Sequence, residues 1–259
     1  MNDATRSDAD GLDLAAVRLL LEESVDRVAE VLAGTTDWNV SDTTRGQYLV
    51  DLDADAVAVP PLVEGGLGVL SEESGHHHPD RPLVAVIDPL DGSTNASRGL
   101  PWYATSICVV DAHGPLVALV ADHVHGHRFR ATRGGGATRD ANPITPADPV
   151  RLDEAIVALS DLPPRRLGWG QYRTFGALAL DLCAVADGRF DAYIDCGVDA
   201  HGPWDYLGGL LVCHEAGAQV DDAHDRDLAV LGHGDRRTPV AASSEGLQAA
   251  CRAARASFT

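Results

Sequence analysis

The chain has 259 residues, of which 45% are hydrophobic, enough apolar material for one large domain or two closely packed lobes. Its 39 acidic and 20 basic residues give a net charge of −19, which argues against nucleic acid or an anionic membrane as a partner. The apolar stretches are too short for a membrane span, and the first residues lack the pattern of a secretory signal.

The five cysteines indicate the cellular compartment. None of them forms a C-x-x-C pair, and four stand in apolar surroundings that are typical of buried thiols in a reducing environment. We therefore expect a cytoplasmic protein.

A helix is predicted over residues 12–32, because apolar residues recur there on one side at helical spacing: Leu14, Val17, Leu21, Val25, Val28 and Leu32. An acidic segment follows, with Asp51, Asp53 and Asp55 at alternate positions. Pro60 and Pro61 come next. Since proline removes a backbone donor and clashes with the preceding turn, we expect the helix in this region to be interrupted, shortened or kinked.

Two short apolar runs, 67–70 and 83–87, are predicted to be buried strands, and each is followed by carboxylates. The first run leads to Glu72 and Glu73, and the second leads to Asp88. The residue before a proline is held extended, so Asp88 belongs to the carboxyl end of its strand. We expect both strand ends to carry acidic groups into loops.

The eight residues Asp88-Pro-Leu-Asp-Gly-Ser-Thr-Asn95 combine two carboxylates with a proline, a glycine and two hydroxyls. Pro89 and Gly92 allow a sharp turn, and the three residues after Gly92 are of the type that caps a helix. Carboxylate oxygens suit a hard cation such as Mg²⁺, and a helix N-terminus suits phosphate. One loop thus offers both halves of a metal-assisted phosphate site.

Further along the chain, residues 103–110 and 116–120 are predicted to form a hairpin, with a third antiparallel strand at 128–133 that ends in a glycine turn at 134–136. Residues 142–149 are rich in proline and form the best candidate boundary. Strands and helices then alternate, which indicates a layered α/β or α+β architecture, over residues 155–159, 174–186, 190–196, 205–216, 240–242 and 244–256.

Three segments together resemble the inositol monophosphatase family of Mg²⁺-dependent, lithium-sensitive phosphatases. They are Ser71-Glu-Glu-Ser74, the Asp88–Asn95 turn, and the helical segment that begins Pro203-Trp-Asp205 and continues to Ala218. The resemblance covers the chain from about residue 12 and implies an α+β fold, a layered αβαβα sandwich. It implies an N-terminal lobe over 1–145 with most of the metal ligands, and a C-terminal lobe over 146–259 with Asp205 and the substrate pocket.

The resemblance also implies roles for single residues. Glu72, Asp88 and the carbonyl of Leu90 are expected to bind one Mg²⁺, and Asp88, Asp91 and Asp205 a second, with two or three ions per active site. Glu72 and the Ser93 hydroxyl are expected to orient the attacking water. The residue that pairs with Ser93 stays open between Asp51 and Asp55, with Asp53 behind them, because the family's T-x-x-D motif is blurred here.

The substrate is expected to contact the backbone of the turn and residues of the C-terminal lobe: Gly92, Ser93, Thr94, Gly176, Ala177, Asp195 and Asp205. A small phosphate ester is the predicted substrate, with myo-inositol 1-phosphate or a similar polyol or sugar phosphate as the leading candidate. Histidinol phosphate and 3′-phosphoadenosine 5′-phosphate are the alternatives. The segment 196–202 is longer than in the inositol enzymes, which favours a reshaped pocket. Members of the family are often homodimers.

Other interpretations of the chain have less support. His76, His77 and His78 are consecutive and cannot all face one metal, so a solvated loop is expected there. His123, His125 and His127 alternate but lack a fourth ligand, and we interpret them as structural. No G-x-S-x-G motif is present, so covalent serine catalysis has no support. The alternative from another class is a catalytically silent relative that binds a metal or ligand.

Overall fold

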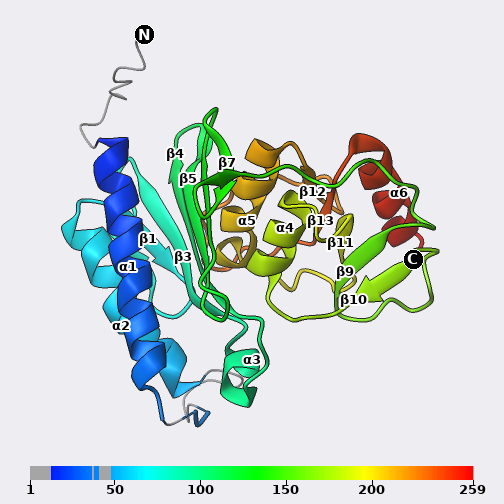
Figure 1. The fold of residues 1–259 in the computed structure, drawn as a ribbon. Helices are drawn as coiled ribbons and strands as arrows, with labels where there is room; N and C mark the ends of the chain where they lie inside the picture. Colours follow the sequence, from blue (N-terminus) through cyan, green and yellow to red (C-terminus); the bar gives the residue numbers. More distant parts are fainter. Residues whose placement is uncertain (1–12, 37, 41–47, 259) are drawn as a thin grey trace.

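The computed structural model describes residues 13–36, 38–40 and 48–258 (Figure 1). Its layers follow one another as helix, sheet, helix, sheet and helix, which confirms the predicted αβαβα sandwich. Helices α1 (Leu14–Gly34) and α2 (Leu49–Glu64) form the first layer, and α4 (Leu178–Ala186) and α5 (Pro203–Ala216) lie between the two sheets. Helix α6 (Glu245–Ala256) forms the last layer.

The first sheet has eight strands in the order β2-β1-β3-β4-β5-β6-β7-β8. Strands β1 and β3 are parallel to each other, and the other pairs are antiparallel. The strands span Gly68–Ser71 (β1), Gly75–His77 (β2), Val84–Asp91 (β3), Ala104–Asp111 (β4), Gly114–Asp122 (β5), Arg128–Thr132 (β6), Gly136–Arg139 (β7) and Asn142–Pro143 (β8). The predicted hairpin, third strand and glycine turn are therefore confirmed.

The first helix follows its apolar pattern. The Asp13 side chain accepts a hydrogen bond from the Ala15 N–H at 3.1 Å and caps the helix. Val17, Leu21, Val25 and Val28 are buried against the first sheet, because their spacing puts them on one face. The prediction is confirmed for the described part of 12–32; residue 12 itself lies outside the described residues.

The expectation that Pro60 and Pro61 interrupt the second helix is wrong. Helix α2 continues through both prolines to Glu64. The prolines stand near its end, so the donors that they remove affect only the final turns, and Pro61 is itself buried beside Leu62. Tertiary packing therefore outweighs the local preference of proline.

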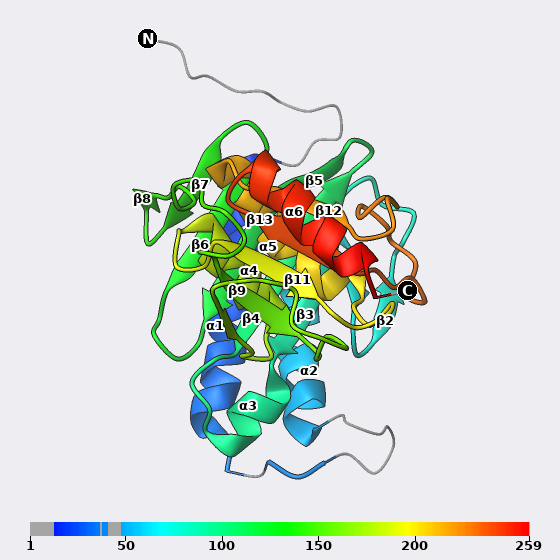
Figure 2. The same ribbon diagram turned by 90° about the vertical axis from the view of Figure 1, so that its right-hand side faces the viewer.

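The second sheet has five strands in the order β10-β9-β11-β13-β12. They span Ile156–Ser160 (β9), Gln171–Arg173 (β10), Ala192–Asp195 (β11), Gln219–Asp222 (β12) and Pro239–Ala242 (β13). Figure 2 shows α6 lying across the outer face of this sheet, where it packs on a core of its own with residues such as Leu247 and Cys251. Strands β10 and β12 are additions to the predicted set.

One large core joins the two sheets. It contains every residue of α4 except Asp181, much of α5, and residues from both sheets such as Val120 and Tyr193. The predicted division between residues 145 and 146 falls in the connection from β8 to β9. All five cysteines are free and buried. Within the described ranges, no helix combines the length and apolar character that crossing a bilayer requires.

Candidate active site

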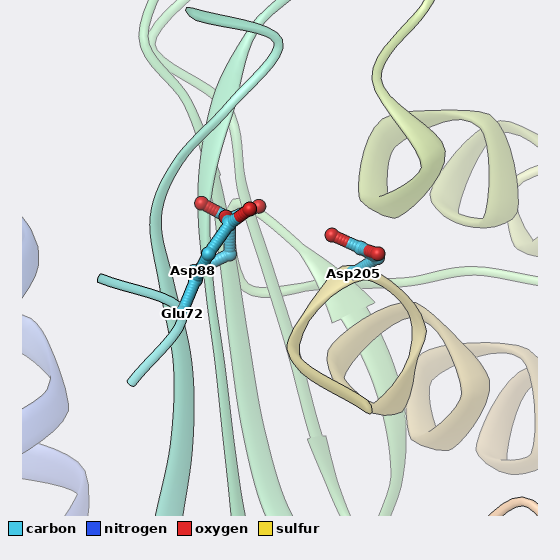
Figure 3. A group of neighbouring side chains, drawn as sticks. All are labelled: Glu72, Asp88 and Asp205. Atoms are coloured by element: carbon cyan, nitrogen blue, oxygen red, sulfur yellow. The ribbon is translucent and has the colours of Figure 1, made fainter. Parts of the chain in front are cut away.

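Three acidic side chains from distant parts of the chain meet at one end of the first sheet (Figure 3). Each of Glu72, Asp88 and Asp205 offers a carboxylate oxygen, and these oxygens all lie within 4.8 Å of one another. Glu72 and Asp88 face Asp205 across the space between the first sheet and the start of α5. Within the described residues this is the one group of three or more such side chains with the spacing of metal ligands.

The strand register explains why Glu72 and Asp88 are neighbours. Ser71 pairs with Ile87 in the parallel ladder of β1 and β3. The residues that follow them, Glu72 and Asp88, therefore lie at the same end of the sheet. The Glu72 N–H donates to the Ile87 carbonyl at 3.1 Å and fixes this register. The two acidic segments that the sequence singles out therefore lie side by side in the sheet.

Strand β3 continues past Asp88, where its end was expected, as far as Asp91, and the turn follows at Gly92. The pairing of β3 with β4 shifts register between Asp88 and Asp91, which marks an irregularity in the strand. Asp88 Oδ1 accepts a hydrogen bond from the Leu90 N–H at 2.9 Å. Gly92 has φ of 89°, and a Cβ there would lie 3.0 Å from the Trp102 carbonyl oxygen. Only glycine fits this position comfortably.

Asp91 has a different environment from the three clustered acids. It is buried, and its Oδ2 accepts a hydrogen bond from the Ala179 N–H, at the start of α4, at 2.7 Å. Burial and the charge of Asp205 raise the pKa of Asp91 to about 7, although the backbone bond opposes them. Asp91 thus links the turn to α4.

Burial and mutual repulsion govern the charge of the cluster. Burial raises the pKa of Glu72 to about 9, helped by the charges of Asp205 and Glu73. Burial also raises the pKa of Asp88, followed by repulsion from Glu72 and Asp91. Carboxylates in this arrangement repel one another until a cation joins them. An all-oxygen donor set of this kind fits Mg²⁺, so the residues present suit the metal that the resemblance implies.

The three aspartates of α2 differ in what they contact. Asp51 accepts a hydrogen bond from the Tyr48 N–H at 2.7 Å, and the Ser93 hydroxyl lies near enough to lower its pKa. Asp51 Oδ1 has no direct hydrogen-bond partner among the described residues, so the Ser93 contact is a longer one. Asp55 instead accepts the Ser71 hydroxyl, and Asp53 is exposed.

The start of α3 (Ser93–Arg98) and the segment before α4 lie against each other. Asn95 joins them, because its Nδ2 donates to the Trp102 carbonyl at 2.8 Å and to the Phe175 carbonyl at 2.6 Å. Ala177 Cβ would lie 3.1 Å from a Cβ on Gly92. Gly92 is thus beside Ala177, and Gly176 is beside Asn95.

Comparison with known proteins identifies the family. Residues 65–257 match the model of the inositol monophosphatase family. The chain belongs to this family. Two curated relatives are named Nus factor SuhB: the Xylella fastidiosa protein is 33% identical over 73% of this chain and 74% of its own length. The Escherichia coli K12 protein is 31% identical over 77% of this chain and 77% of its own length.

Solved structures of the family have the same fold. An inositol monophosphatase from Anabaena superposes with a TM-score of 0.76 at 25% identity, over 93% of this chain and 96% of that one. The extragenic suppressor protein suhB of Bartonella henselae superposes with a TM-score of 0.79, also at 25% identity, over 93% and 98%. The layered sandwich is therefore the fold of the family.

One member of this site was not predicted. His201 stands between Asp205 and Asp195, with Nδ1 at 3.4 Å from Asp205 Oδ2 and Nε2 at 3.7 Å from Asp195 Oδ2. Burial lowers the pKa of His201, but the hydrogen bond and charge of Asp205 outweigh this, and the net shift is upward. The sequence offers only an indirect signal for His201. The segment 196–202 before Pro203 and Trp204 is long, but no pattern within it singles out the histidine.

The two histidine groups singled out in the sequence, 76–78 and 123–127, have structural surroundings where their contacts are given. His76 and His77 belong to the short strand β2, where a solvated loop was expected, because residues 75–77 pair with β1. His123 is held in a turn by a 2.7 Å hydrogen bond to Thr105, and burial lowers its pKa to about 4. His125 and His127 pair with aspartates at 2.8 and 2.6 Å.

Proposed function

We propose that this protein is a Mg²⁺-dependent phosphatase that hydrolyses a small phosphate monoester. The observation that carries the proposal is the cluster of Glu72, Asp88 and Asp205, whose ligand oxygens lie within 4.8 Å of one another. Membership of the inositol monophosphatase family supports the same reaction. The first candidate substrate is myo-inositol 1-phosphate or a similar polyol or sugar phosphate.

The metal ligands are assigned from the family motifs and the geometry together. Glu72, Asp88 and the Leu90 carbonyl would hold one ion, and Asp88, Asp91 and Asp205 a second, for two or three Mg²⁺ per site. When bound, Mg²⁺ neutralises the phosphate, lowers the pKa of water and stabilises the leaving oxygen. The raised pKa values of Glu72, Asp88 and Asp91, which burial causes first and repulsion second, support a site built for cations.

The remaining residues would position the water and the phosphate. Ser93, with Asp51 behind its hydroxyl, and Glu72 would orient the attacking water and accept its proton. The N–H groups of Gly92, Ser93 and Thr94 would hold phosphate oxygens, since a first helical turn leaves its donors without internal partners. Gly176 and Ala177 would contact the rest of the ester from the start of α4.

The test is phosphate release with and without Mg²⁺ over a panel of esters. The panel contains inositol 1-phosphate, histidinol phosphate, fructose bisphosphate and 3′-phosphoadenosine 5′-phosphate. We expect Mg²⁺-dependent release from at least one of them and loss of at least about a thousandfold in Asp88→Asn, because Asp88 would help to hold both ions. Asp153→Asn, an exposed aspartate on the far lobe, is the matched control.

A second candidate function comes from the names of the curated relatives. The proteins that are 31–33% identical are called Nus factors, which favours a regulatory role in place of catalysis or beside it. Wild-type protein that binds Mg²⁺ but releases no phosphate from any ester of the panel would favour this candidate. From the family resemblance we also propose that the protein is a homodimer. Light scattering would give the molar mass in solution that tests this.

A further inference from the structure

The segment 196–202 places one side chain between two acids that have different predicted roles. His201 lies two residues before Pro203, the first residue of α5. Its ring lies between Asp205 of the carboxylate cluster and Asp195 at the end of β11. The ring keeps 19% of its surface exposed, whereas the Asp195 side chain is fully buried. His201 therefore separates Asp195 from the space beside Asp205.

Asp195 is held in place behind this ring. Its Oδ1 accepts the Gly197 N–H at 2.8 Å, while its Oδ2 is buried with no hydrogen-bond partner among the described residues. The buried Arg255 of α6 donates to the carbonyls of Asp195 and Gly197 at 2.7 and 2.5 Å. Arg255 therefore fixes the backbone of this short stretch, and the Asp195 side chain cannot rotate outward without breaking its buried hydrogen bond with the Gly197 N–H.

The contacts of the His201 ring leave it able to bind another group. Its nitrogens lie 3.4 Å from Asp205 Oδ2, 3.5 Å from the Tyr193 hydroxyl and 3.7 Å from Asp195 Oδ2. These distances exceed the roughly 2.9 Å of a strong N–H···O hydrogen bond. A ligand hydroxyl next to Asp205 can therefore replace one of these weak contacts at little cost.

We propose that His201, and not Asp195, contacts the alcohol portion of the substrate, and that Asp195 positions the His201 ring. The inference rests on the proposed function, and it concerns the hydroxyl-bearing part of the ester, since phosphate is assigned to the turn after Asp88. His201 is then a specificity-determining residue. Asp195, which the family resemblance made a substrate contact, acts in this chain through the histidine.

The first experiment compares two esters in wild type and His201→Ala. One ester is inositol 1-phosphate, and the other is p-nitrophenyl phosphate, whose alcohol portion has no free hydroxyl. We expect KM for inositol 1-phosphate to rise about tenfold, the effect of losing one hydrogen bond, with less than about a threefold change for the aryl ester. His201→Gln, which keeps a donor, should recover part of the loss. Equal effects on both esters would overturn the proposal.

The second experiment asks whether Asp195 acts through His201. Asp195→Asn should raise KM for inositol 1-phosphate in the wild-type background and have no further effect in His201→Ala, because the ring that it positions is gone. An undiminished effect of Asp195→Asn in the His201→Ala background would show a direct contact between Asp195 and the substrate, against the proposal.

Two further measurements distinguish a substrate contact from a metal-binding or nonspecific role of His201. The Mg²⁺ affinity measured by calorimetry should be the same in wild type and His201→Ala within about twofold. A large loss of affinity would mean that the His201 ring supports Asp205 in binding the metal instead, and the proposal would fail. His214→Ala, an exposed histidine at the far end of α5, is the matched control and should leave both esters unaffected.

The outcome stays decisive if the proposed function fails. Wild-type protein without phosphatase activity would refute hydrolysis, and calorimetric binding of the two esters to the Mg²⁺-loaded protein then takes the place of KM. Selective weakening of inositol 1-phosphate in His201→Ala still supports the inference. Equal weakening of both esters, or none, still rejects it.

Discussion

Asp51, Asp53 and Asp55 stand two residues apart on α2, yet each has its own surroundings. Asp51 is near Ser93, Asp55 accepts the Ser71 hydroxyl, and Asp53 faces solvent. Burial raises the pKa of Asp51 to about 7, so this carboxyl is able to exchange a proton near neutral pH. The geometry therefore favours Asp51 as the partner of the Ser93 hydroxyl, which the spacing alone left open.

Substitution of these aspartates tests that choice. We expect Asp51→Asn to lower kcat by about a hundredfold or more, the usual effect of losing a general base. Asp55→Asn should keep kcat within a fewfold but lower the free energy of unfolding by about 1 kcal/mol, because an amide oxygen accepts the buried Ser71 hydroxyl more weakly than the carboxylate does. Steady-state kinetics and urea unfolding measure the two effects, with the exposed Asp53→Asn as control. A large loss of kcat in Asp55→Asn alone would reverse the assignment.

Sequence patterns reach some of these residues and miss others for a physical reason. Glu72 directly follows β1, and Asp88 follows the apolar residues with which β3 begins. The two strands pair in parallel, so the apolar pattern and the sheet register place the two acids together. His201 and the burial of Asp195 depend on the course of residues 196–202 and on Arg255, which lies 58 residues beyond Gly197 in the chain. Such long-range anchoring has no periodic signature that a pattern can reveal.

Among the elements, α5 approaches its neighbours through two glycines. A Cβ on Gly208 would lie 2.6 Å from Ser106 Oγ of the first sheet, and one on Gly209 would lie 2.6 Å from Leu182 Cβ of α4. The two glycines thus allow α5 to approach a sheet on one side and a helix on the other. This close approach also sets the position of Asp205 in the first turn of α5.

We expect Gly209→Ala to destabilise the protein by about 1–3 kcal/mol, since Leu182 Cβ is fixed to the backbone of α4 and cannot move away. Alanine is the better helix former by about 1 kcal/mol, and overpacking outweighs this gain. Gly234→Ala is the control, because a Cβ there meets nothing within 4 Å; its effect should stay within about 0.5 kcal/mol. Denaturant titration measures both. Equal stability of the two variants would contradict this account of α5.

Sequence patterns likewise predict some helices and strands of this fold and miss others. Helix α1 and strands β3 to β6 were predicted because their apolar residues follow clear helical or strand patterns. Strand β10 was not, since all three of its residues are exposed and it exists through pairing with β9. The continuation of α2 through Pro60 and Pro61 was missed because local preference was overruled by burial.

At the scale of the whole molecule, the buried acids couple folding to pH and metal. Burial, with repulsion in second place, raises the pKa of Glu72 to about 9, that of Asp91 to about 7, and that of Asp88 as well. Unfolded, these groups have a pKa of about 4. Above that pH the folded, metal-free protein binds more protons than the unfolded chain, so its stability falls as pH rises.

Calorimetric unfolding with EDTA and with Mg²⁺ at pH 6 and pH 8 tests this coupling. We expect Tm in EDTA to be lower at pH 8 than at pH 6, and Mg²⁺ to raise Tm more at pH 8, because the ion binds deprotonated carboxylates. The Asp88→Asn variant should show a smaller response to both changes. A Mg²⁺ effect on Tm that is identical at the two pH values would contradict the expectation.

The core that α4 and α5 share with both sheets has a consequence for how the chain can be divided. The residues of this core come from both sides of the connection between β8 and β9, so neither half of the chain can complete it alone. A polypeptide cut between residues 144 and 155 would leave two fragments that each expose a wide apolar face. Such fragments should be poorly soluble when expressed separately and should recover a folded complex only when they are produced together.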